Sequence, residues 1–206
     1  MTQQQQRPAQ AMRGNPKYTW DDLVAAIGQD FSAGEVITAD EVIDRTAVER
    51  YCEPWEIGNP IHWDRRVAKG AGYRDVVAPW SSIRQTFSYS GFWRPGKQTA
   101  FPTDLNKDAS GKLGTFQVQG KELPFPPHRQ GIVTDMEMEF FEPACVGDRI
   151  TVKGKKLVNA RVRQTRVGYG AFTNTVAEYF NQRGELVARA NFGSFSYNPG
   201  EQGPQR

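Results

Sequence analysis

The first hydrophobic pattern in the chain has helical spacing. Between residues 18 and 27 the apolar positions recur every three or four residues, which predicts a short amphipathic helix. Thr19 can cap this helix, and Asp21 and Asp22 lie in its first turn, near the positive end of the helix dipole. We therefore expect the helix to pack through one face.

A second helical pattern begins at Asp44. This residue can serve as the N-cap of a helix that runs to about Glu53. Pro54 stops the helix, because proline lacks the backbone donor that the next turn needs. A brief strand around residues 41–43 is expected just before it.

Two further helices are predicted from their first residues. Asp64 can cap a helix of one or two turns that runs through Lys69 and is ended by the glycines that follow. Pro79 precedes a longer apolar stretch, residues 80–92, and proline favours the first turn of a helix. The apolar positions of this stretch predict a buried helix.

The C-terminal part of the chain alternates polar and apolar residues, which is the period of a β-strand. In the first of these segments acidic residues alternate with apolar ones, so one face is expected to be solvated. A tight hairpin is predicted at residues 181–184. The predicted strands are 132–141, 149–158, 170–180 and 186–197. Helices followed by an antiparallel meander indicate the α+β class.

Segments with little apolar patterning flank and interrupt these elements. Residues 1–16, rich in Gln, and residues 199–206 cannot bury enough apolar surface to offset their ordering entropy, so both are predicted to be disordered tails. Residues 93–129 lack periodicity and are interpreted as a long loop excursion. One domain is predicted over residues 17–198, the excursion included.

Composition excludes several classes of protein. The 206 residues favour one domain, and 26 Lys and Arg against 23 Asp and Glu leave a net charge of +3, too small to favour nucleic acid. No apolar run approaches the roughly 20 residues of a membrane span, and no secretory signal follows Met1. The 2 cysteines have neither a disulfide nor a metal-ligand pattern. We expect a cytoplasmic protein without a metal site or membrane partner.

Four motifs occur in an order that resembles one protein family. Asn59-Pro60-Ile61-His62, followed five residues later by Ala68 and preceded by Tyr51, resembles the hydratase motif of the MaoC-like dehydratase and enoyl-CoA hydratase family. The branch it resembles most is related to the dehydratase domain of type I fatty-acid synthases. The other motifs, a passage into the predicted helix, a turn with proline and a final hairpin, lie at 72–79, 141–150 and 181–188.

The resemblance implies a single hot-dog fold, in which a curved antiparallel sheet wraps around a central helix, here residues 80–92. The N-terminal helix and the loop excursion are additions to it. The implied substrate is a 2-enoyl or 3-hydroxyacyl thioester of CoA or acyl carrier protein, with no cofactor. A lone hot-dog sheet has an exposed edge, so we expect a homodimer, a heterodimer with a second hot-dog chain, or a higher oligomer.

The resemblance also assigns candidate catalytic residues. His62 would be the catalytic imidazole, and the alternative is a histidine that braces its loop. The family's catalytic Asp lies five residues before the histidine, where this chain has Ile57. Glu56 is the best remaining carboxylate, the alternative being a solvated loop charge, and Glu53 and Asn59 are secondary candidates.

The implied reaction needs a base that activates water, an acid that protonates C2 and a donor for the enolate oxygen. A carboxylate and an imidazole that share one water can supply the proton transfers. Backbone N–H groups at a helix N-terminus suit the oxyanion, because their dipoles are fixed before the reaction. Ala78, Trp80 and Ser81 are the candidates for that role, since Pro79 has no N–H.

Three functions remain open on the sequence. The first is a hydratase or dehydratase of acyl thioesters that uses His62 and Glu56. The second is a non-catalytic hot-dog partner of a heteromeric enoyl-CoA hydratase, because such a partner would lack the catalytic Asp. The third is an acyl-CoA thioesterase, since that activity occurs on the same fold and a fold does not determine a function.

Overall fold

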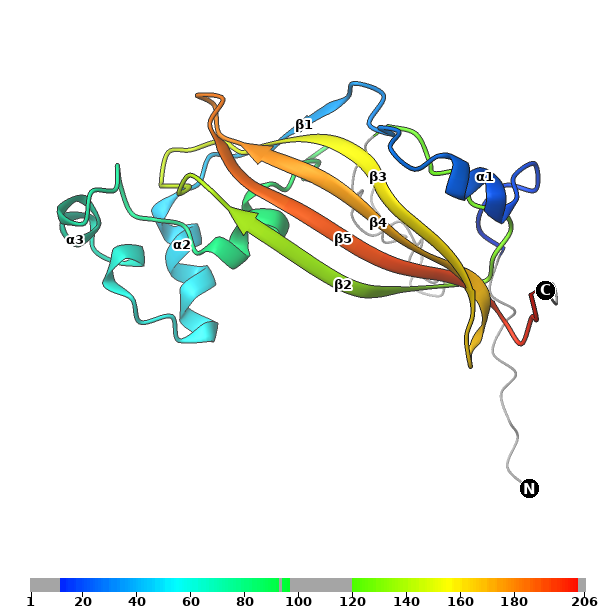
Figure 1. Ribbon diagram of the computed structural model, residues 1–206. Coiled ribbons are helices and arrows are strands. Elements are labelled where there is room, and N and C mark those ends of the chain that lie inside the picture. The colour runs from blue at the N-terminus through cyan, green and yellow to red at the C-terminus, as the bar shows by residue number, and fades with distance from the viewer. Residues whose placement is uncertain (1–11, 93, 97–119, 204–206) are drawn as a thin grey trace.

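A curved antiparallel sheet forms the centre of the protein. The computed structural model describes residues 12–92, 94–96 and 120–203. Within this part of the chain the sheet has five strands in the order β1-β3-β4-β5-β2. Figure 1 shows that the long strands bend along their length. The strands are β1 (Val36–Thr38), β2 (Gln130–Phe140), β3 (Thr151–Gln164), β4 (Gly168–Phe180) and β5 (Leu186–Pro199).

The predicted meander of four long strands is confirmed, and so is the hairpin at 181–184, where the Gly184 N–H donates to the Asn181 carbonyl over 3.0 Å. The strand predicted at 41–43 is wrong. The short strand lies earlier, at β1, and pairs with β3. Ile43 is instead 1% exposed and belongs to the core, so its apolar character reflects burial in a loop rather than a place in the sheet.

The helices are short and gather at the two ends of the sheet (Figure 1). α1 begins after Thr19, whose side chain forms a reciprocal capping box with Asp22. Asp44 and Asp64 cap α2 and α3, as predicted. The helices are α1 (Trp20–Ala25), α2 (Arg45–Cys52), α3 (Arg65–Gly70) and the single turns η1 (Glu53–Trp55), η2 (Pro60–His62), η3 (Trp80–Ser82) and η4 (Ile83–Phe87).

The helix predicted over 80–92 is shorter than expected. It consists of the 3-10 turn η3 and the π-helical turn η4, and it ends at Phe87. Beyond that point the N–H groups of Gly91 and Phe92 donate to the Asp40 carboxylate over 2.9 and 2.8 Å. A carboxylate from a distant loop therefore takes the donors that a longer helix would have directed to its own carbonyls.

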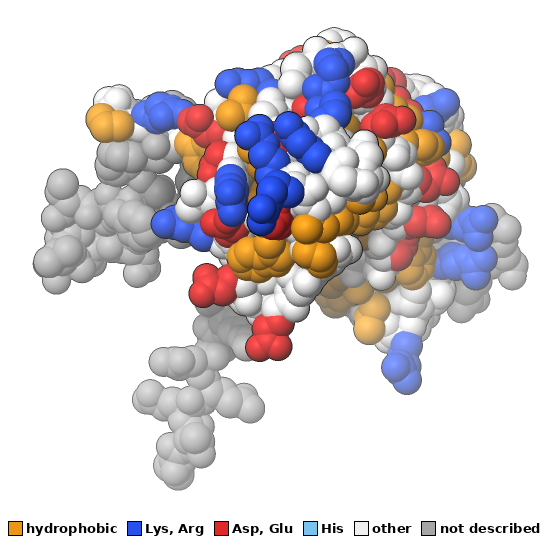
Figure 2. Space-filling model, turned by 90° about the vertical axis from the view of Figure 1, so that its left-hand side faces the viewer, with side chains coloured by type: hydrophobic (Ala, Val, Ile, Leu, Met, Phe, Trp, Pro, Cys, Tyr) orange, Lys and Arg blue, Asp and Glu red, His pale blue; other side chains and the backbone are white. Residues whose placement is uncertain are grey.

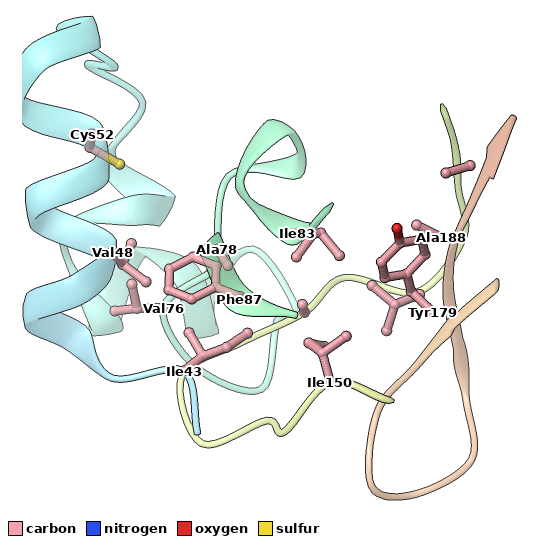
Figure 3. Packing of buried hydrophobic residues seen from close by; sticks show 13 residues of the cluster. Ile43, Val48, Cys52, Val76, Ala78, Ile83, Phe87, Ile150, Tyr179 and Ala188 are labelled. Carbon is pink, nitrogen blue, oxygen red and sulfur yellow. The ribbon is translucent and has the colours of Figure 1, made fainter. Parts of the chain in front are cut away.

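The main core lies where the helical segments meet the sheet. In Figure 3 the Phe87 ring lies between Val48 of α2 and Ala78, and Ile83 points toward Tyr179 on β4. Each of these side chains is at most 7% exposed. Burial of one such side chain stabilises the fold by roughly 1.5–3 kcal/mol. A second cluster joins Leu23 of α1 and its C-cap residue Ala26 to Leu157 and Ala160 of β3 and Ala171 of β4.

A buried carboxylate holds the turn between β2 and β3. Asp148 is 1% exposed and accepts bonds from both terminal nitrogens of Arg74 at 3.0 and 2.9 Å. It also accepts bonds from Arg183 at 2.8 Å and from the Cys145 N–H at 2.9 Å. Burial by itself raises the pKa of Asp148, but these donors outweigh it and lower the pKa to about 2.

Parts of the segments predicted as tails and excursion are held by the domain. Arg13 exchanges backbone bonds of 2.8 and 2.9 Å with His128, which corrects the prediction of a tail that is disordered through residue 16. The Gly203 N–H donates to the Gln164 side chain at 2.8 Å, which corrects the C-terminal boundary in the same way. The rest of both predicted tails, and most of the predicted excursion, lie outside the described residues. No helix in the described part of the chain is long and apolar enough to cross a membrane.

Candidate functional site

The loop between α2 and α3 presents His62. Asn59 caps η2 by accepting the Ile61 N–H at 3.3 Å, and Pro60 opens the turn. His62 ends this turn and is 7% exposed. Its Nδ1 lies 2.7 Å from the backbone oxygen of Val77. Asn59 therefore has a positioning role in the loop.

The contact with Val77 determines where the imidazole carries its proton. A carbonyl oxygen can only accept a hydrogen bond, so Nδ1 of His62 must be the donor. In the neutral ring Nε2 is then the unprotonated nitrogen, with a lone pair available for a proton. Val77 is itself fixed, because its N–H donates to the Ile61 carbonyl at 3.1 Å and it forms an antiparallel bridge with Cys145. The backbone oxygen that orients the ring is thus itself held in place by two other segments.

Ile57, the residue five positions before His62, is part of the protein's packing. Its side chain packs against the main core, and its N–H donates to the Cys52 carbonyl at 3.1 Å. Its carbonyl accepts the indole N–H of Trp63 at 2.6 Å. Through its two backbone groups Ile57 thus links the end of α2 to Trp63, the residue that follows His62. An aliphatic side chain at this position cannot exchange a proton.

The two candidate glutamates lie on the surface of the same loop. Glu53 is the exposed first residue of η1, and Glu56 is exposed at its C-cap with φ 50° and ψ 40°. This left-handed conformation is uncommon outside glycine and holds the Glu56 backbone in a sharp turn. Within the described residues neither carboxylate has a hydrogen bond or ion pair with His62.

The candidate oxyanion donors differ in availability. The N–H of Ala78 donates to the Ala144 carbonyl at 2.8 Å, so this group is not free for a substrate and the expectation for Ala78 is corrected. Trp80 and Ser81 are the first two residues of η3, and the first N–H groups of a helical turn have no acceptor within it. The Ser81 hydroxyl also accepts a bond from Tyr51 at 2.9 Å, which ties η3 to α2.

An aromatic contact extends the site toward the edge of the sheet. The Trp80 ring lies 5.0 Å from the ring of Phe140, the last residue of β2. α3 adds the exposed cations Arg65, Arg66 and Lys69 at the same end of the molecule. Figure 2 views this end and shows Lys and Arg side chains gathered beside a hydrophobic patch. Arg65 is already paired with Asp75 and Arg66 with Asp64, so within the described residues Lys69 is the α3 cation without an ion pair.

Other features of the described residues do not suggest a competing centre. No group of three or more His, Cys, Asp and Glu side chains could hold a metal within them. Burial raises the pKa of the thiols of Cys52 and Cys145, which makes both poor nucleophiles. A surface hollow of about 330 Å³ lies beside Arg129 and Asn198. It is at the end of the sheet opposite α2 and α3 (Figure 1).

Sequence reasoning missed the partner of His62 because that partner is a backbone oxygen. The Val77 carbonyl has no side-chain signature, and it reaches the imidazole only through the pairing of residues 76–78 with the turn at 144–146. Asp40 was missed for a related reason: an acidic residue in a loop carries no sign that it will accept N–H groups from residues 51 and 52 positions away.

Comparisons with known proteins give a family match and a curated relative. The family model described as "FAS1-like, dehydratase domain region" matches residues 25–190. The chain is 25% identical over 179 residues to the probable enoyl-CoA hydratase alpha subunit of Thermomonospora curvata. That alignment covers 86% of this chain and 51% of the relative, so the chain spans about half the length of the curated relative it matches.

Solved structures show the same fold. The ChsH1-ChsH2 complex from Mycobacterium tuberculosis matches with a TM-score of 0.58 at 20% identity, covering 88% of this chain and 95% of that chain. The MaoC-like dehydratase from Rhodospirillum rubrum matches with a TM-score of 0.50 at 16% identity, covering 81% and 92%. These likenesses confirm the single hot-dog fold.

Proposed function

The chain belongs to the FAS1-like dehydratase-region family, and from this premise we propose that it is a hydratase or dehydratase of acyl thioesters. It would add water to a 2-enoyl thioester or remove water from a 3-hydroxyacyl thioester, carried by CoA or acyl carrier protein. No cofactor takes part in the proposed reaction. The name of the curated relative, a probable enoyl-CoA hydratase alpha subunit, supports this substrate class.

The proposed reaction proceeds through an enolate. In the hydration direction, Nε2 of His62 accepts a proton from water while the water oxygen bonds to C3 of the enoyl group. The electron pair of the C2=C3 bond moves to C2 and onto the thioester oxygen. The imidazolium then returns the proton to C2, which restores both the neutral ring and the thioester. Each positioned proton transfer contributes typically 10²–10⁴-fold.

The observation that carries this proposal is the bond from Nδ1 of His62 to the Val77 carbonyl. It leaves Nε2 as the basic nitrogen and fixes the plane of the ring before substrate binds. The N–H groups of Trp80 and Ser81 are the proposed donors to the enolate oxygen, because preorganised donors are most effective where charge develops. Glu56 is the proposed second group on the attacking water.

Hydration of a crotonyl thioester by the purified chain tests the assignment. His62→Ala is expected to lower kcat/KM by about 10²–10⁴-fold. His62→Asn is the matched variant, because its amide can donate to Val77 as Nδ1 does but offers no basic nitrogen; it should fold normally and be equally slow. Arg163→Ala, at an exposed side chain near the end of β3 that lies away from His62, should leave the rate unchanged.

The role of Glu56 is tested in the same assay. Glu56→Gln keeps the size of the side chain and removes its base, so a drop of about tenfold or more is expected if it holds the water. Activity that survives both His62→Ala and Glu56→Gln would contradict the proposed pair. Release of free thiol instead of loss of the enoyl double bond would indicate a thioesterase.

A non-catalytic partner subunit is the second candidate. Ile57 favours it, because the position of the family's catalytic carboxylate holds an aliphatic side chain that is partly buried against the core. The names of two similar proteins, an alpha subunit and a complex, also support a heteromeric hot-dog assembly. In that case the purified chain would be inactive, and hydration by the mixed assembly would be unaffected by His62→Asn.

A further inference from the structure

Arg84 is a half-buried cation on η4, one helical turn after the proposed oxyanion donors. Within the described residues it forms no ion pair. Carboxylate partners are present for Arg45, Arg65, Arg74, Arg183 and Arg189. A guanidinium is not deprotonated in proteins, so Arg84 keeps its charge in this place. A partly desolvated charge without a counter-charge is unfavourable, which favours an anionic ligand.

Two aromatic side chains hold the guanidinium in position. The central carbon of the Arg84 guanidinium lies 4.9 Å from the centre of the Phe192 ring on β5. Burial raises the pKa of Tyr179 on β4, and the charge of Arg84 and a hydrogen bond from it act in the opposite direction. Because the Phe192 ring contacts the flat face of the guanidinium, most N–H donors along its edge stay available to a ligand.

An apolar row connects Arg84 to the proposed oxyanion donors. The Trp80 ring lies 5.0 Å from the Phe140 ring on β2, and Met136 of β2 is the register partner of Phe192. Side chains two residues apart share one face of a strand, so residues 136, 138 and 140 form a row. Met136 is 47% exposed and Phe140 is 38% exposed. The row therefore offers open apolar surface with a cation at one end.

The length of this row limits the size of the ligand. Four residues of a strand span roughly 13 Å, and four residues of a helical turn span roughly 6–8 Å. The guanidinium of Arg84 therefore lies roughly 6–13 Å from the N–H groups of Trp80 and Ser81. A thioester bound at these N–H groups would place a chain of several carbons along the row, with its far end at Arg84.

The anion could be a carboxylate on the acyl chain or a phosphate of the carrier, and the surroundings favour the carboxylate. The carrier arm between thioester and phosphate contains amide groups, which an apolar row would leave without hydrogen-bond partners. An acyl chain has no such groups. A carboxylate also matches the single charge of Arg84 and can accept two parallel N–H bonds from its planar fork.

We propose that Arg84 binds a carboxylate at the far end of the acyl chain, so that the ligand is the thioester of a dicarboxylic acid. The methylene groups of the chain lie along Phe140 and Met136. Arg84 then determines specificity and takes no part in the proton transfers at His62. This assignment rests on the proposed function, because it takes the other end of the ligand to be a thioester.

Binding of two unreactive thioesters tests the proposal. Adipyl-CoA ends in a carboxylate, whereas hexanoyl-CoA has the same number of acyl carbons and ends in a methyl group. By titration calorimetry, the wild-type chain is expected to bind adipyl-CoA roughly 10–100-fold more tightly, the range of hydrogen bonds between charged groups. The corresponding 2-enoyl thioesters should show the same preference in KM, with similar kcat.

Matched variants locate the effect at the guanidinium. Arg84→Met can still pack on Phe192 but has no donor, so its affinity for adipyl-CoA should fall to that for hexanoyl-CoA, which should be unchanged. Arg84→Lys keeps the charge without the planar fork and should retain part of the preference. Arg163→Met, at an exposed side chain of β3, should change neither affinity. If Arg84→Met does not fold, the comparison on the wild-type chain decides.

Three results would overturn the proposal. The first is equal affinity of the wild-type chain for the two thioesters, and the second is binding of neither. The third is an equal loss of both affinities in Arg84→Met, which would assign Arg84 to a phosphate of the carrier. A preference for adipyl-CoA that depends on Arg84 would support the carboxylate site even if neither 2-enoyl thioester were hydrated. Only the proposed function would then fail.

Discussion

Replacement of Asp148 by Asn should destabilise the protein in a pH-dependent way. The carboxylate is almost fully buried, and Arg74, Arg183 and the Cys145 N–H hold its pKa at about 2, below the ordinary 3.8. One pKa unit corresponds to about 1.4 kcal/mol, so ionisation of Asp148 contributes about 2 kcal/mol to stability at neutral pH. Asn keeps the shape of the side chain but cannot carry that charge.

The sign of the pH dependence follows from the lowered pKa. The contribution is fully present above the unfolded-state pKa near 4 and is lost as the pH falls toward 2, where the folded carboxylate also takes a proton. Urea unfolding at pH 7 should therefore show D148N less stable than wild type by at least about 2 kcal/mol. The difference should shrink steadily between pH 5 and pH 2.

Glu49→Gln is the control for D148N, because it removes a carboxylate whose ion pair is not buried. Glu49→Gln removes an exposed ion pair with Arg45 at 2.7 Å within α2, which should cost no more than about 0.5 kcal/mol at pH 7. If D148N matched this small effect, or if its deficit stayed constant from pH 7 to pH 2, the linkage argument for Asp148 would be refuted.

Three other changes test the packing and the caps. Gly170→Ala should lower the free energy of unfolding by several kcal/mol, measured by thermal unfolding, because its Cβ would lie 2.1 Å from the backbone oxygen of Ser196. Gly70→Ala, in α3 with open space around it, should raise the free energy of unfolding by up to about 1 kcal/mol. Equal effects of the two variants would contradict this account. Asp44→Ala should cost about 1 kcal/mol by loss of the α2 cap, measured by urea unfolding, with no change expected in the m-value. Tyr51→Phe should lower stability by roughly 0.5–1.5 kcal/mol through the lost bond to Ser81, and a neutral result would show that water replaces it.

The sequence predicted the parts of the fold that depend on local patterns. The caps of α1, α2 and α3 and the four long strands follow from short-range spacing and were recovered. The errors arose where distant contacts decide the structure. Ile43 lies in the core rather than in a strand. The helix ends at Phe87, and the N–H groups of Gly91 and Phe92 donate to the Asp40 carboxylate instead of continuing it.

The sequence predicted which side chains form the candidate site, but not the backbone contacts that position them. The motif around Asn59 and His62 identified the imidazole and its loop. It could not show that the Val77 carbonyl orients the ring, or that the Ala78 N–H is used by Ala144, because both are backbone contacts made by the tertiary fold. The contact of Glu56 with the attacking water stays a prediction for the same reason.

The backbone contacts of His62 also have a consequence for the order of folding. Val77 is positioned by its bridge to Cys145, a residue 83 positions after His62 in the chain. Contacts of such long sequence separation form late, because the intervening loop must first be closed at an entropic cost. During synthesis, the imidazole can be locked only after the turn at 144–146 has left the ribosome. The orientation of the candidate base thus depends on a segment that is synthesised well after the loop that carries it.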